Sequence, residues 1–584
     1  MDKLMKTTPV RRRGRMVSTL TGLCALGALQ FAMAADQTTG SVRGQVTGPD
    51  GRAVSGAVVT LKDERNGSSR QIRPDADGKF STTGLKVGGP YEISVTAGGY
   101  GGYTVEGVTV SLGNVTNVNF TLNPQTMEEI VVQAQALNNA TVAMGPASGF
   151  SLADMEMAPA INRDIKDLIR LDPRVYVDEA FVDGIQCAGA NPRFNSLTVD
   201  GVRLNDNFGL NSNGYPTERM PFSYDSLQQV AVELAPFDVQ FGGFSACNIN
   251  AVTRSGTNRL SASVFYDYTS DSLQGDKLEG TDIDLGSFSE DRYGVTLGGP
   301  LIADTLFGFL AYEKLKGAEV FDRGPAGSGR GREVAGVSVA QYDQILAAAK
   351  NLYNYDPGSL PASLPVEDEK LLLRMDWQIS DAHRAAFTYT YNDGFNISES
   401  DGDSNELEFS NHYYERGAEL NAYVAQMFSD WSDTFSTELR ISYSELKNRQ
   451  ISLAGTDFGE VQITTTNDHD NDGVASRATV YLGADDSRHA NKLSYENLSY
   501  KAAFSWFAGD HLISGGYERE EFDGFNLFIQ EAEGEYRFSS IQDFLDGRPN
   551  RITYENAAPS NNPDDAAASF RYGINTLYLQ DEYS

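Results

Sequence analysis

The sequence predicts a mainly β, exported protein whose long C-terminal part is an antiparallel sheet of the kind that crosses an outer membrane. Three observations carry this prediction. The N-terminus has the basic, apolar and small-residue segments of a secretion signal. The residues after Asn258 alternate between apolar and polar in runs of about ten. No later stretch reaches about eighteen consecutive apolar residues, so the sequence predicts no transmembrane helix.

Residues 1–34 form the predicted signal peptide. A mostly apolar run from Met16 to Phe31 is too short to span a bilayer stably, and Ala32-Met33-Ala34 has the pattern of a cleavage site. The basic residues before this run are Lys3, Lys6, Arg11, Arg12, Arg13 and Arg15. Cleavage removes these six together with Asp2, a net charge of +5, so the formal charge changes from −33 to −38. Such acidity argues against nucleic acid as a partner.

Two cysteines, Cys187 and Cys247, remain after cleavage. An even pair in an oxidising compartment predicts a disulfide, which would close a loop of about sixty residues and contribute roughly 3 to 4 kcal/mol. Two free, buried thiols are the alternative.

Residues 38–124 are predicted to form a small all-β sandwich. Strand-like runs at 41–46, 56–62, 79–81, 91–96 and 115–122 are separated by turn sequences such as Pro49-Asp50-Gly51. The pattern resembles the carboxypeptidase regulatory-like domain, which implies a transthyretin-like fold and no catalysis. The residues of the resemblance are Gly44, Gly51, Gly56-Ala57, Asp75, Gly78, Phe80, Gly84-Leu85, Tyr91 and Gly99-Tyr100.

A short strand from Met127 to Ala134 follows, in a linker over residues 125–140. Ile130, Val131 and Val132 are β-branched and come after Glu128 and Glu129, and the sequence offers them no neighbouring strand. An unpaired edge of this kind predicts a partner protein that binds by strand addition. The alternative is that this strand is the last one of the preceding module.

Residues 141–257 contain an ordered set of motifs: Asn162–Ile169, Leu171–Val175, Asn191–Val202, Ala235–Gly243 and Asn248–Asn258. Together they resemble the plug domain of TonB-dependent outer-membrane receptors, most closely the Oar-like group that carries an N-terminal regulatory-like domain. The resemblance implies an α+β plug and a TonB box at Glu128, Glu129, Ile130, Val131 and Val132. It also implies a TonB-type periplasmic energy-transducing partner, an extracellular ligand and a periplasmic N-terminal domain.

Residues 258–584 are predicted to form an antiparallel β-barrel in outer-membrane lipid. Leu371, Leu373, Met375, Trp377 and Ile379 alternate with Leu372, Arg374, Asp376 and Gln378, and a turn at 380–383 leads into a second alternating run. A large soluble β protein would alternate in the same way. The sequence has short turns on one side and long polar segments at 317–366, 393–417 and 523–569, which favours a membrane barrel over a soluble protein. It predicts that those segments are extracellular loops.

Neither enzymatic nor metal motifs are convincing. His412 and Glu415 have the spacing of two zinc ligands, but a metal site also needs a third ligand and an open position on a packed scaffold, whereas this motif follows a polar loop in a strand-rich region. Asp468, Asp470 and Asp472 begin like a calcium loop, yet position twelve is Thr479 where a bidentate Glu is needed. The sequence therefore predicts no catalytic residue and no cofactor, with calcium at these three aspartates as a weak candidate.

The barrel is predicted to be incomplete. The residues from Asn258 to Ser584 supply about twelve strands, whereas a plugged receptor barrel has about twenty-two. Ser584 also falls within an apparent strand, so we expect a truncated or partial sequence.

Energised transport of a ligand across the outer membrane is the function that the resemblance implies. A passive structural, adhesive or secretion-related outer-membrane protein is the first alternative, and a secreted zinc peptidase is the second. Siderophores, glycans, peptides and proteins all stay open as ligands, and so does the direction of transport.

Overall fold

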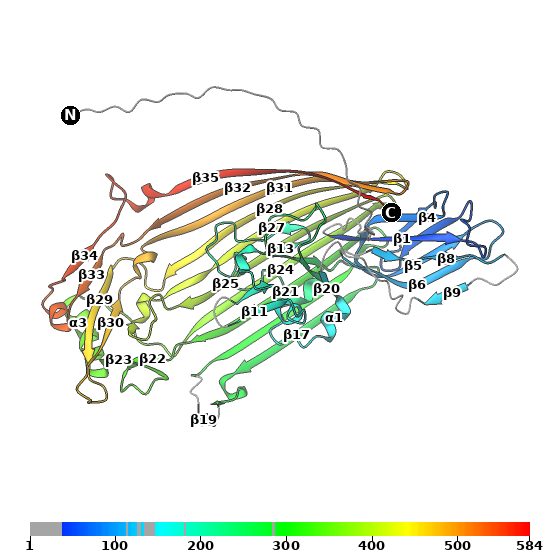
Figure 1. The fold of residues 1–584 in the computed structure, drawn as a ribbon. Helices are drawn as coiled ribbons and strands as arrows, with labels where there is room; N and C mark the ends of the chain where they lie inside the picture. Colours follow the sequence, from blue (N-terminus) through cyan, green and yellow to red (C-terminus); the bar gives the residue numbers. More distant parts are fainter. Residues whose placement is uncertain are drawn as a thin grey trace, which may run out of the picture.

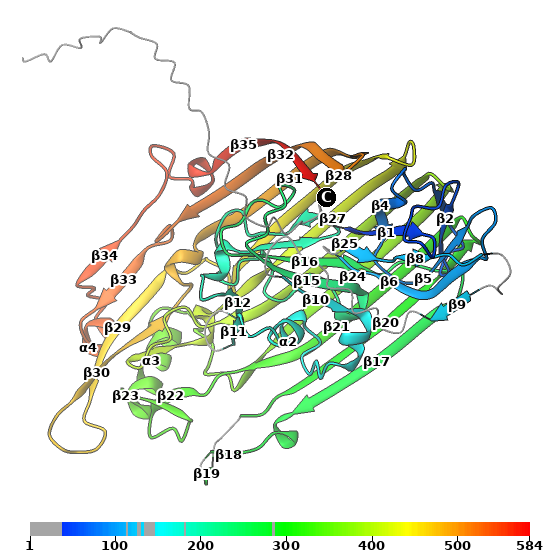
Figure 2. The same cartoon turned by 45° about the vertical axis from the view of Figure 1, so that its right-hand side comes forward.

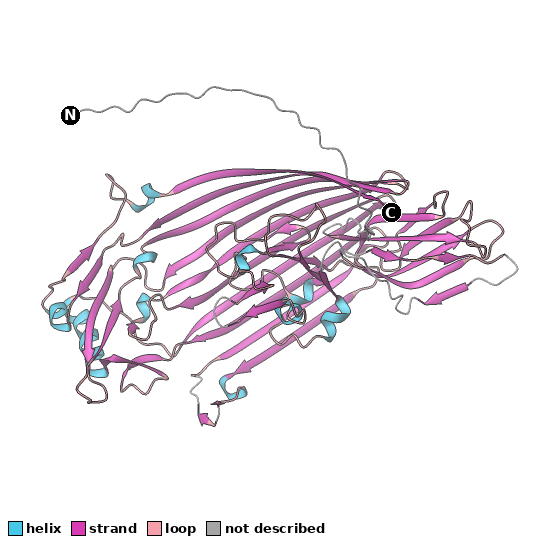
Figure 3. Ribbon diagram, viewed as in Figure 1, coloured by secondary structure: helices cyan, strands magenta, loops and turns pink. Residues whose placement is uncertain are grey.

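The computed structural model describes residues 38–112, 115–124, 130–133, 147–179, 183–278, 280–282 and 286–583. A long, curved sheet forms the body of the molecule (Figure 1). A small sandwich packs at one end of this sheet, and a second, smaller sheet extends from the other end. Strands dominate throughout, with short helices in the central domain and at the end far from the sandwich (Figure 3). The predicted mainly β architecture is confirmed.

The N-terminal sandwich consists of two sheets packed on a valine-rich core. One sheet has the order β4-β1-β7, with β8 also pairing with β1, and the other has the order β3-β2-β5-β6-β9. Alternate residues of each strand point inward, as Val59, Leu61, Ile93 and Val95 do. The strands are β1 (Thr39–Thr47), β2 (Val58–Asp63), β3 (Ser69–Ile72), β4 (Lys79–Lys86), β5 (Gly88–Thr96), β6 (Tyr103–Val110), β7 (Val115–Asn117), β8 (Phe120–Thr121) and β9 (Ile130–Gln133).

A five-stranded mixed sheet, in the order β10-β15-β16-β13-β14, forms the central domain. It lies against the concave face of the long sheet (Figure 2), and its apolar core continues into Ala418, Leu420 and Val424 of that sheet. Its elements are β10 (Ala147–Ser151), α1 (Leu152–Met157), α2 (Ile165–Ile169), β11 (Val175–Asp178), β12 (Gly184–Cys187), η1 (Pro192–Phe194), β13 (Ser196–Val199), β14 (Val202–Arg203), η2 (Tyr224–Ser226), β15 (Leu227–Leu234) and β16 (Cys247–Thr253). This domain occupies the place expected of a plug.

The long sheet has ten antiparallel strands in sequence order, beginning at β17 and ending at β35. The predicted alternation is borne out on β24, where Trp377 is 50% exposed on the outer face and Leu372 is 2% exposed on the inner face. The strands are β17 (Ser261–Ser270), β20 (Ser289–Ile302), β21 (Leu306–Val320), β24 (Ser363–Ser380), β25 (His383–Ser398), β27 (Tyr414–Asp430), β28 (Phe435–Ser452), β31 (Ala490–Ala508), β32 (His511–Ile529) and β35 (Ala568–Tyr583).

The long connections at the end far from the sandwich contain folded structure, which the sequence analysis did not predict. Three of them contribute strands to one five-stranded sheet, in the order β26-β30-β29-β33-β34. This sheet packs with α3 on a separate apolar core that includes Ile345, Phe409 and Ile463. We call it the loop sheet. Its elements are β26 (Glu406–Glu408), β29 (Glu460–Asn467), β30 (Ser476–Leu482), β33 (Glu535–Phe538) and β34 (Arg551–Thr553), with α3 (Val339–Leu352) and α4 (Ile541–Leu545).

The remaining short elements connect these parts. They are β18 (Lys277–Leu278), β19 (Thr281–Asp282), β22 (Arg323–Ala326), β23 (Arg332–Ser338), η3 (Asp271–Leu273), η4 (Ser410–His412), η5 (Asp486–Arg488) and η6 (Pro563–Ala566). Among the helices of the described residues, none is long and apolar enough to cross a membrane.

The sandwich packs against the short-turn end of the long sheet. Lys79 Nζ lies 2.8 Å from Asp510 Oδ1 in the β31–β32 turn, and Arg384 Nη2 donates to the Gly84 carbonyl oxygen over 2.7 Å. The loop sheet lies at the opposite end (Figure 1). The molecule therefore has one end that carries the sandwich and one end that carries the long connections.

Candidate functional site

The strand that was expected to be unpaired is β9, and the structure pairs it. β9 runs parallel to β6, with Ile130 opposite Tyr103 and Val131 opposite Thr104. The expectation of a strand without a sheet is therefore wrong. The sequence analysis missed the partner β6, because a glycine-rich stretch at 98–102 precedes it and obscures the start of its alternation.

β9 is nevertheless an edge strand. It ends the order β3-β2-β5-β6-β9, so within the described part of the chain its second edge has no strand beside it. Val131 is 56% exposed and Val132 is 40% exposed, although consecutive residues of a strand point to opposite faces. Glu128 and Glu129 lie outside the described residues. β9 thus offers both a free edge and apolar side chains for strand addition.

A buried ionic network fastens the central domain to the long sheet. Asp200, in the turn after β13, accepts hydrogen bonds from Thr253 N over 3.0 Å and from Arg374 Nη1 over 3.2 Å. Arg374 also donates through Nε to Asp376 Oδ2 over 2.9 Å, and Thr388 Oγ1 donates to Asp200 over 3.1 Å. Three separate strands therefore converge on one carboxylate of the central domain.

The same network reaches the sandwich. Lys86, at the end of β4, places its Nζ 3.0 Å from Asp376 Oδ1. Asp376 thus lies between Lys86 of the sandwich and Arg374 of the long sheet, and Arg374 continues to Asp200. Because the side chains of Asp376, Arg374 and Asp200 are nearly inaccessible, these charges depend on one another for compensation. The network physically links all three parts of the molecule.

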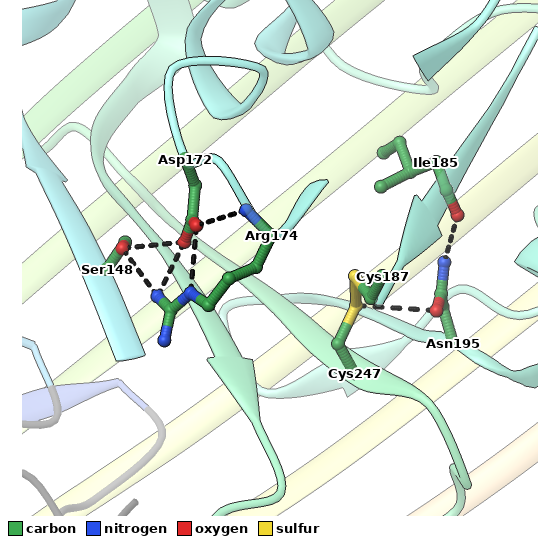
Figure 4. Close-up of a disulfide and its surroundings, with 7 residues drawn as sticks. All are labelled: Ser148, Asp172, Arg174, Ile185, Cys187, Asn195 and Cys247. Carbon is green, nitrogen blue, oxygen red and sulfur yellow. Dashed lines mark hydrogen bonds and ion pairs between the residues drawn. A yellow bond between two sulfur atoms is a disulfide. The ribbon is translucent and has the colours of Figure 1, made fainter. Parts of the chain in front are cut away.

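Cys187 and Cys247 form a disulfide in the structure, with their Cα atoms 6.0 Å apart. The bond joins the end of β12 to the start of β16 (Figure 4). Nearby, Asn195 Nδ2 donates to the Ile185 carbonyl oxygen over 2.6 Å. The disulfide therefore holds the β11–β12 hairpin to the sheet of the central domain.

Asp172 and Arg174, from the second motif of this domain, form a further fixed contact. Arg174 donates to both carboxylate oxygens of Asp172, over 2.9 and 2.6 Å, and Ser148 Oγ donates to Asp172 Oδ2 over 2.7 Å (Figure 4). The hydrogen bonds from Arg174 hold the pKa of Asp172 well below its usual range. They tie β10 to the segment after α2.

The predicted calcium residues Asp468, Asp470 and Asp472 lie together in the loop between β29 and β30, each with one oxygen within 4.8 Å of the others. Their carboxylates accept backbone N–H groups of the same loop, including Gly473 N and Val474 N. Thr479, at position twelve, lies on β30 and cannot supply a bidentate carboxylate. Calcium here stays a weak prediction.

His412 belongs to a different cluster from the one that its spacing to Glu415 suggested. His412, Asp401, Glu460 and Asp485 each place one ligand-type atom within 4.8 Å of the others. His412 Nε2 lies 2.8 Å from Asp401 Oδ2 and 4.0 Å from Asp485 Oδ2. The sequence analysis missed this cluster, because its residues lie between Asp401 and Asp485 on two separate connections.

Burial and mutual charge perturb this cluster strongly. Burial raises the pKa of Glu408 to about 7 and that of Glu460 to about 8. Burial by itself lowers the pKa of His412, but the hydrogen bond with Asp401 and the charges of Glu408, Glu460 and Asp485 together raise it to about 10. Perturbed groups of this kind are typical of functional sites and also of structural ion clusters.

Comparisons with known proteins agree with this architecture. Residues 41–123 match the family described as carboxypeptidase regulatory-like domain, and residues 338–584 match the outer membrane beta barrel domain. The structure of the outer membrane transporter YddB from Escherichia coli superposes with a TM-score of 0.52 at 14% identity, covering 76% of this chain and 55% of that one. That likeness concerns the fold.

The fold and these matches show a carboxypeptidase regulatory-like domain followed by a β-barrel domain of the outer-membrane type. In sequence, the chain is similar to the TonB-dependent transporter Oar of Myxococcus xanthus, with 27% identity over 316 residues. That match covers 50% of this chain and 28% of the relative. The sandwich thus coincides with the regulatory-like match, and the barrel match includes the strands of the long sheet from β24 to β35.

Proposed function

We propose that this protein moves an extracellular ligand across the outer membrane with energy that a TonB-type periplasmic protein delivers through β9. One observation carries the proposal: the segment that matches the TonB box by position is an edge strand with a free edge and exposed valines. A partner strand can add to that edge without first unfolding the sandwich. The relatedness to a TonB-dependent transporter supports this role.

In this proposal, force on β9 passes to the plug. β10 follows β9 in sequence and pairs with β15 over residues Ala147–Ser151, so tension on the linker acts at the edge of the plug sheet. The plug is fastened to the wall through Asp200 and Arg374. Rearrangement of that contact would free the plug to move, and no chemistry on the ligand is required.

The ligand would meet the end that carries the loop sheet, where the long connections gather. The relative that the chain matches is a transporter, which argues against the zinc peptidase alternative. We propose no ligand class. The passive structural or adhesive alternative differs from ours in one respect, because it requires no partner at β9.

Proline substitution tests the proposal. Proline removes a backbone N–H donor, and the N–H groups of consecutive strand residues point to opposite edges. One of Val131→Pro and Val132→Pro should therefore disrupt pairing with β6, and the other should disrupt pairing at the free edge. Val131→Thr is the matched control, because it keeps the β-branch and the N–H.

Binding of the purified full chain to the periplasmic domain of the TonB-type protein from the same organism would be measured by calorimetry. We expect at least one proline variant to weaken binding about tenfold or more while the threonine variant stays close to wild type. Equal binding by all four proteins would contradict the proposal and favour the passive alternative.

A further inference from the structure

The cluster around His412 sits where the loop sheet meets the barrel wall. Asp401 and His412 come from the connection between β25 and β27, whereas Glu460 and Asp485 come from the connection between β28 and β31. The side chains of His412, Glu460 and Asp485 are almost fully buried. Asp401 is partly exposed, with 37% of its side chain accessible. The cluster is therefore contributed by two separate connections, and three of its four residues are buried.

The histidine is oriented for metal binding. His412 Nδ1 lies 3.1 Å from the Gly483 carbonyl oxygen. A carbonyl oxygen can only accept, so Nδ1 carries a proton and donates it. Nε2 faces Asp401 and Asp485 and donates to the Asp401 carboxylate, and a bound metal ion would take the place of that second proton. Histidines that bind metals commonly donate their second ring N–H to a backbone carbonyl in this way, which fixes the ring and the tautomer.

Carboxyl groups outnumber basic groups in the cluster, among the described residues. Four carboxylates, those of Asp401, Glu408, Glu460 and Asp485, surround one imidazole, and Arg488 Nε lies 3.5 Å from Asp485 Oδ1. When all four carboxylates are ionised, a doubly protonated imidazole and this guanidinium leave two negative charges uncompensated. Asp485 Oδ1 is buried and accepts no hydrogen bond. Arg488 Nε is within ion-pair distance of this oxygen but makes no hydrogen bond to it, and a buried carboxylate oxygen without a hydrogen bond is costly.

We propose that Asp401, His412, Glu460 and Asp485 bind one divalent transition-metal ion of the Zn²⁺ or Mn²⁺ type. The donor set of one imidazole nitrogen and carboxylate oxygens suits these ions, whereas Ca²⁺ and Mg²⁺ prefer oxygen ligands alone. A dication offsets the two excess charges and takes the position at Nε2. It ties two connections together and holds the loop sheet in place over the barrel wall. The inference does not depend on energy coupling through β9.

Zinc binding to the full chain tests the proposal. The protein would be purified in detergent, stripped with a chelator and titrated with ZnCl₂ by calorimetry. We expect one equivalent to bind, and Glu460→Gln and Asp485→Asn each to weaken binding about tenfold or more. The controls are Glu415→Gln, which removes the zinc-like spacing to His412, and Asp470→Asn, which removes an exposed carboxylate. Both should bind as the wild type does.

A second measurement keeps the test decisive if a variant fails to fold. X-ray absorption of the zinc-loaded wild type should show nitrogen and oxygen ligands at about 2.0–2.2 Å, and added zinc should raise the melting temperature of the stripped protein. Substoichiometric binding would overturn the proposal. So would zinc binding that survives in both cluster variants, a loss of binding in Glu415→Gln, or sulfur in the ligand shell.

Discussion

Arg374 of the long sheet and Asp200 of the central domain, which we propose is the plug, form a buried ion pair, with Nη1 3.2 Å from Oδ1. Thr253 and Thr388 complete the hydrogen bonds of the same carboxylate. The stabilisation of a buried carboxylate by several donors depends strongly on their positions, because each partner that moves away leaves a charge without compensation. The ion pair therefore stabilises the contact between the two parts only while its hydrogen bonds are all in place.

Asp200→Asn should loosen the plug while the barrel wall stays folded. The substitution leaves the Arg374 guanidinium with one partner fewer, so we expect local stability of the plug to fall by about 3 kcal/mol. Hydrogen exchange at β16 measures this fall. The matched control is Glu156→Gln, on an exposed position of α1, and it should leave the exchange of β16 unchanged. Equal protection in both variants would contradict the role assigned to Asp200.

Lys86→Met should weaken docking of the sandwich on the barrel. Thr83 Oγ1 lies 3.2 Å from Ser436 Oγ across this interface, so a protein with cysteine at both positions should form a disulfide quickly. Without Lys86, the Asp376 carboxylate loses a partner and the docked state is less populated. We expect slower disulfide formation. Lys62→Met, on an exposed position of β2, is the control and should not change the rate.

Removal of both plug cysteines should destabilise the plug. Cys187 and Cys247 are separated by 60 residues, and a loop of that length contributes about 4 kcal/mol in the chain-entropy model. Replacing both with serine should make the plug more sensitive to protease, and reducing the wild type under native conditions should have the same effect. Unchanged digestion in both experiments would show that the bond is dispensable for plug stability.

The metal-free loop sheet should lose stability as the pH rises from about 5 to 10. Glu408 and Glu460 have folded-state pKa values of about 7 and 8, above their ordinary values, so the folded state binds more protons than the unfolded one through that window. His412, at about 10, contributes stability below its ordinary pKa and loses it as the pH passes through the raised value. Both effects lower the stability of the loop sheet as the pH rises.

Hydrogen exchange at β29 and β30, measured in chelator over this pH range, reports the change. Glu460→Gln should flatten the lower part of the profile, because glutamine does not titrate. Asp401, Asp485 and Tyr481 also face His412, and Arg488 pairs with Asp485; these groups set the size of the effect. Rising stability between pH 6 and 9 would contradict the assignment.

Sequence reasoning succeeded where local patterns decide the structure. The alternation from Leu371 to Ile379 follows directly from one lipid-facing and one inner face, and β24 has that arrangement. The loop sheet was missed, because its strands are short and come from three connections that only tertiary packing brings together. The sequence shows hydrophobic residues such as Phe409 and Ile463, but it does not show that they pack in one common core.

The candidate site was predicted in part, for the same reason. Val131 and Val132 could be identified as an edge strand from their β-branched run, but the parallel partner β6 could not. For the metal candidate, the sequence identified one residue correctly but not its neighbours. His412 drew attention through its spacing to Glu415, whereas its actual neighbours, Asp401 and Asp485, are set by how the connections fold and not by any motif.

Crosslinking from β9 tests the central claim most directly. Val131→Cys would be introduced into the protein in its native cells, together with single cysteines in the periplasmic domain of the TonB-type protein. Thr121→Cys, an exposed strand position on β8 of the same sandwich, is the matched control. We expect a specific disulfide from position 131 that increases when extracellular ligand is present, and none from position 121. Equal crosslinking from both positions, or none from position 131, would contradict the account.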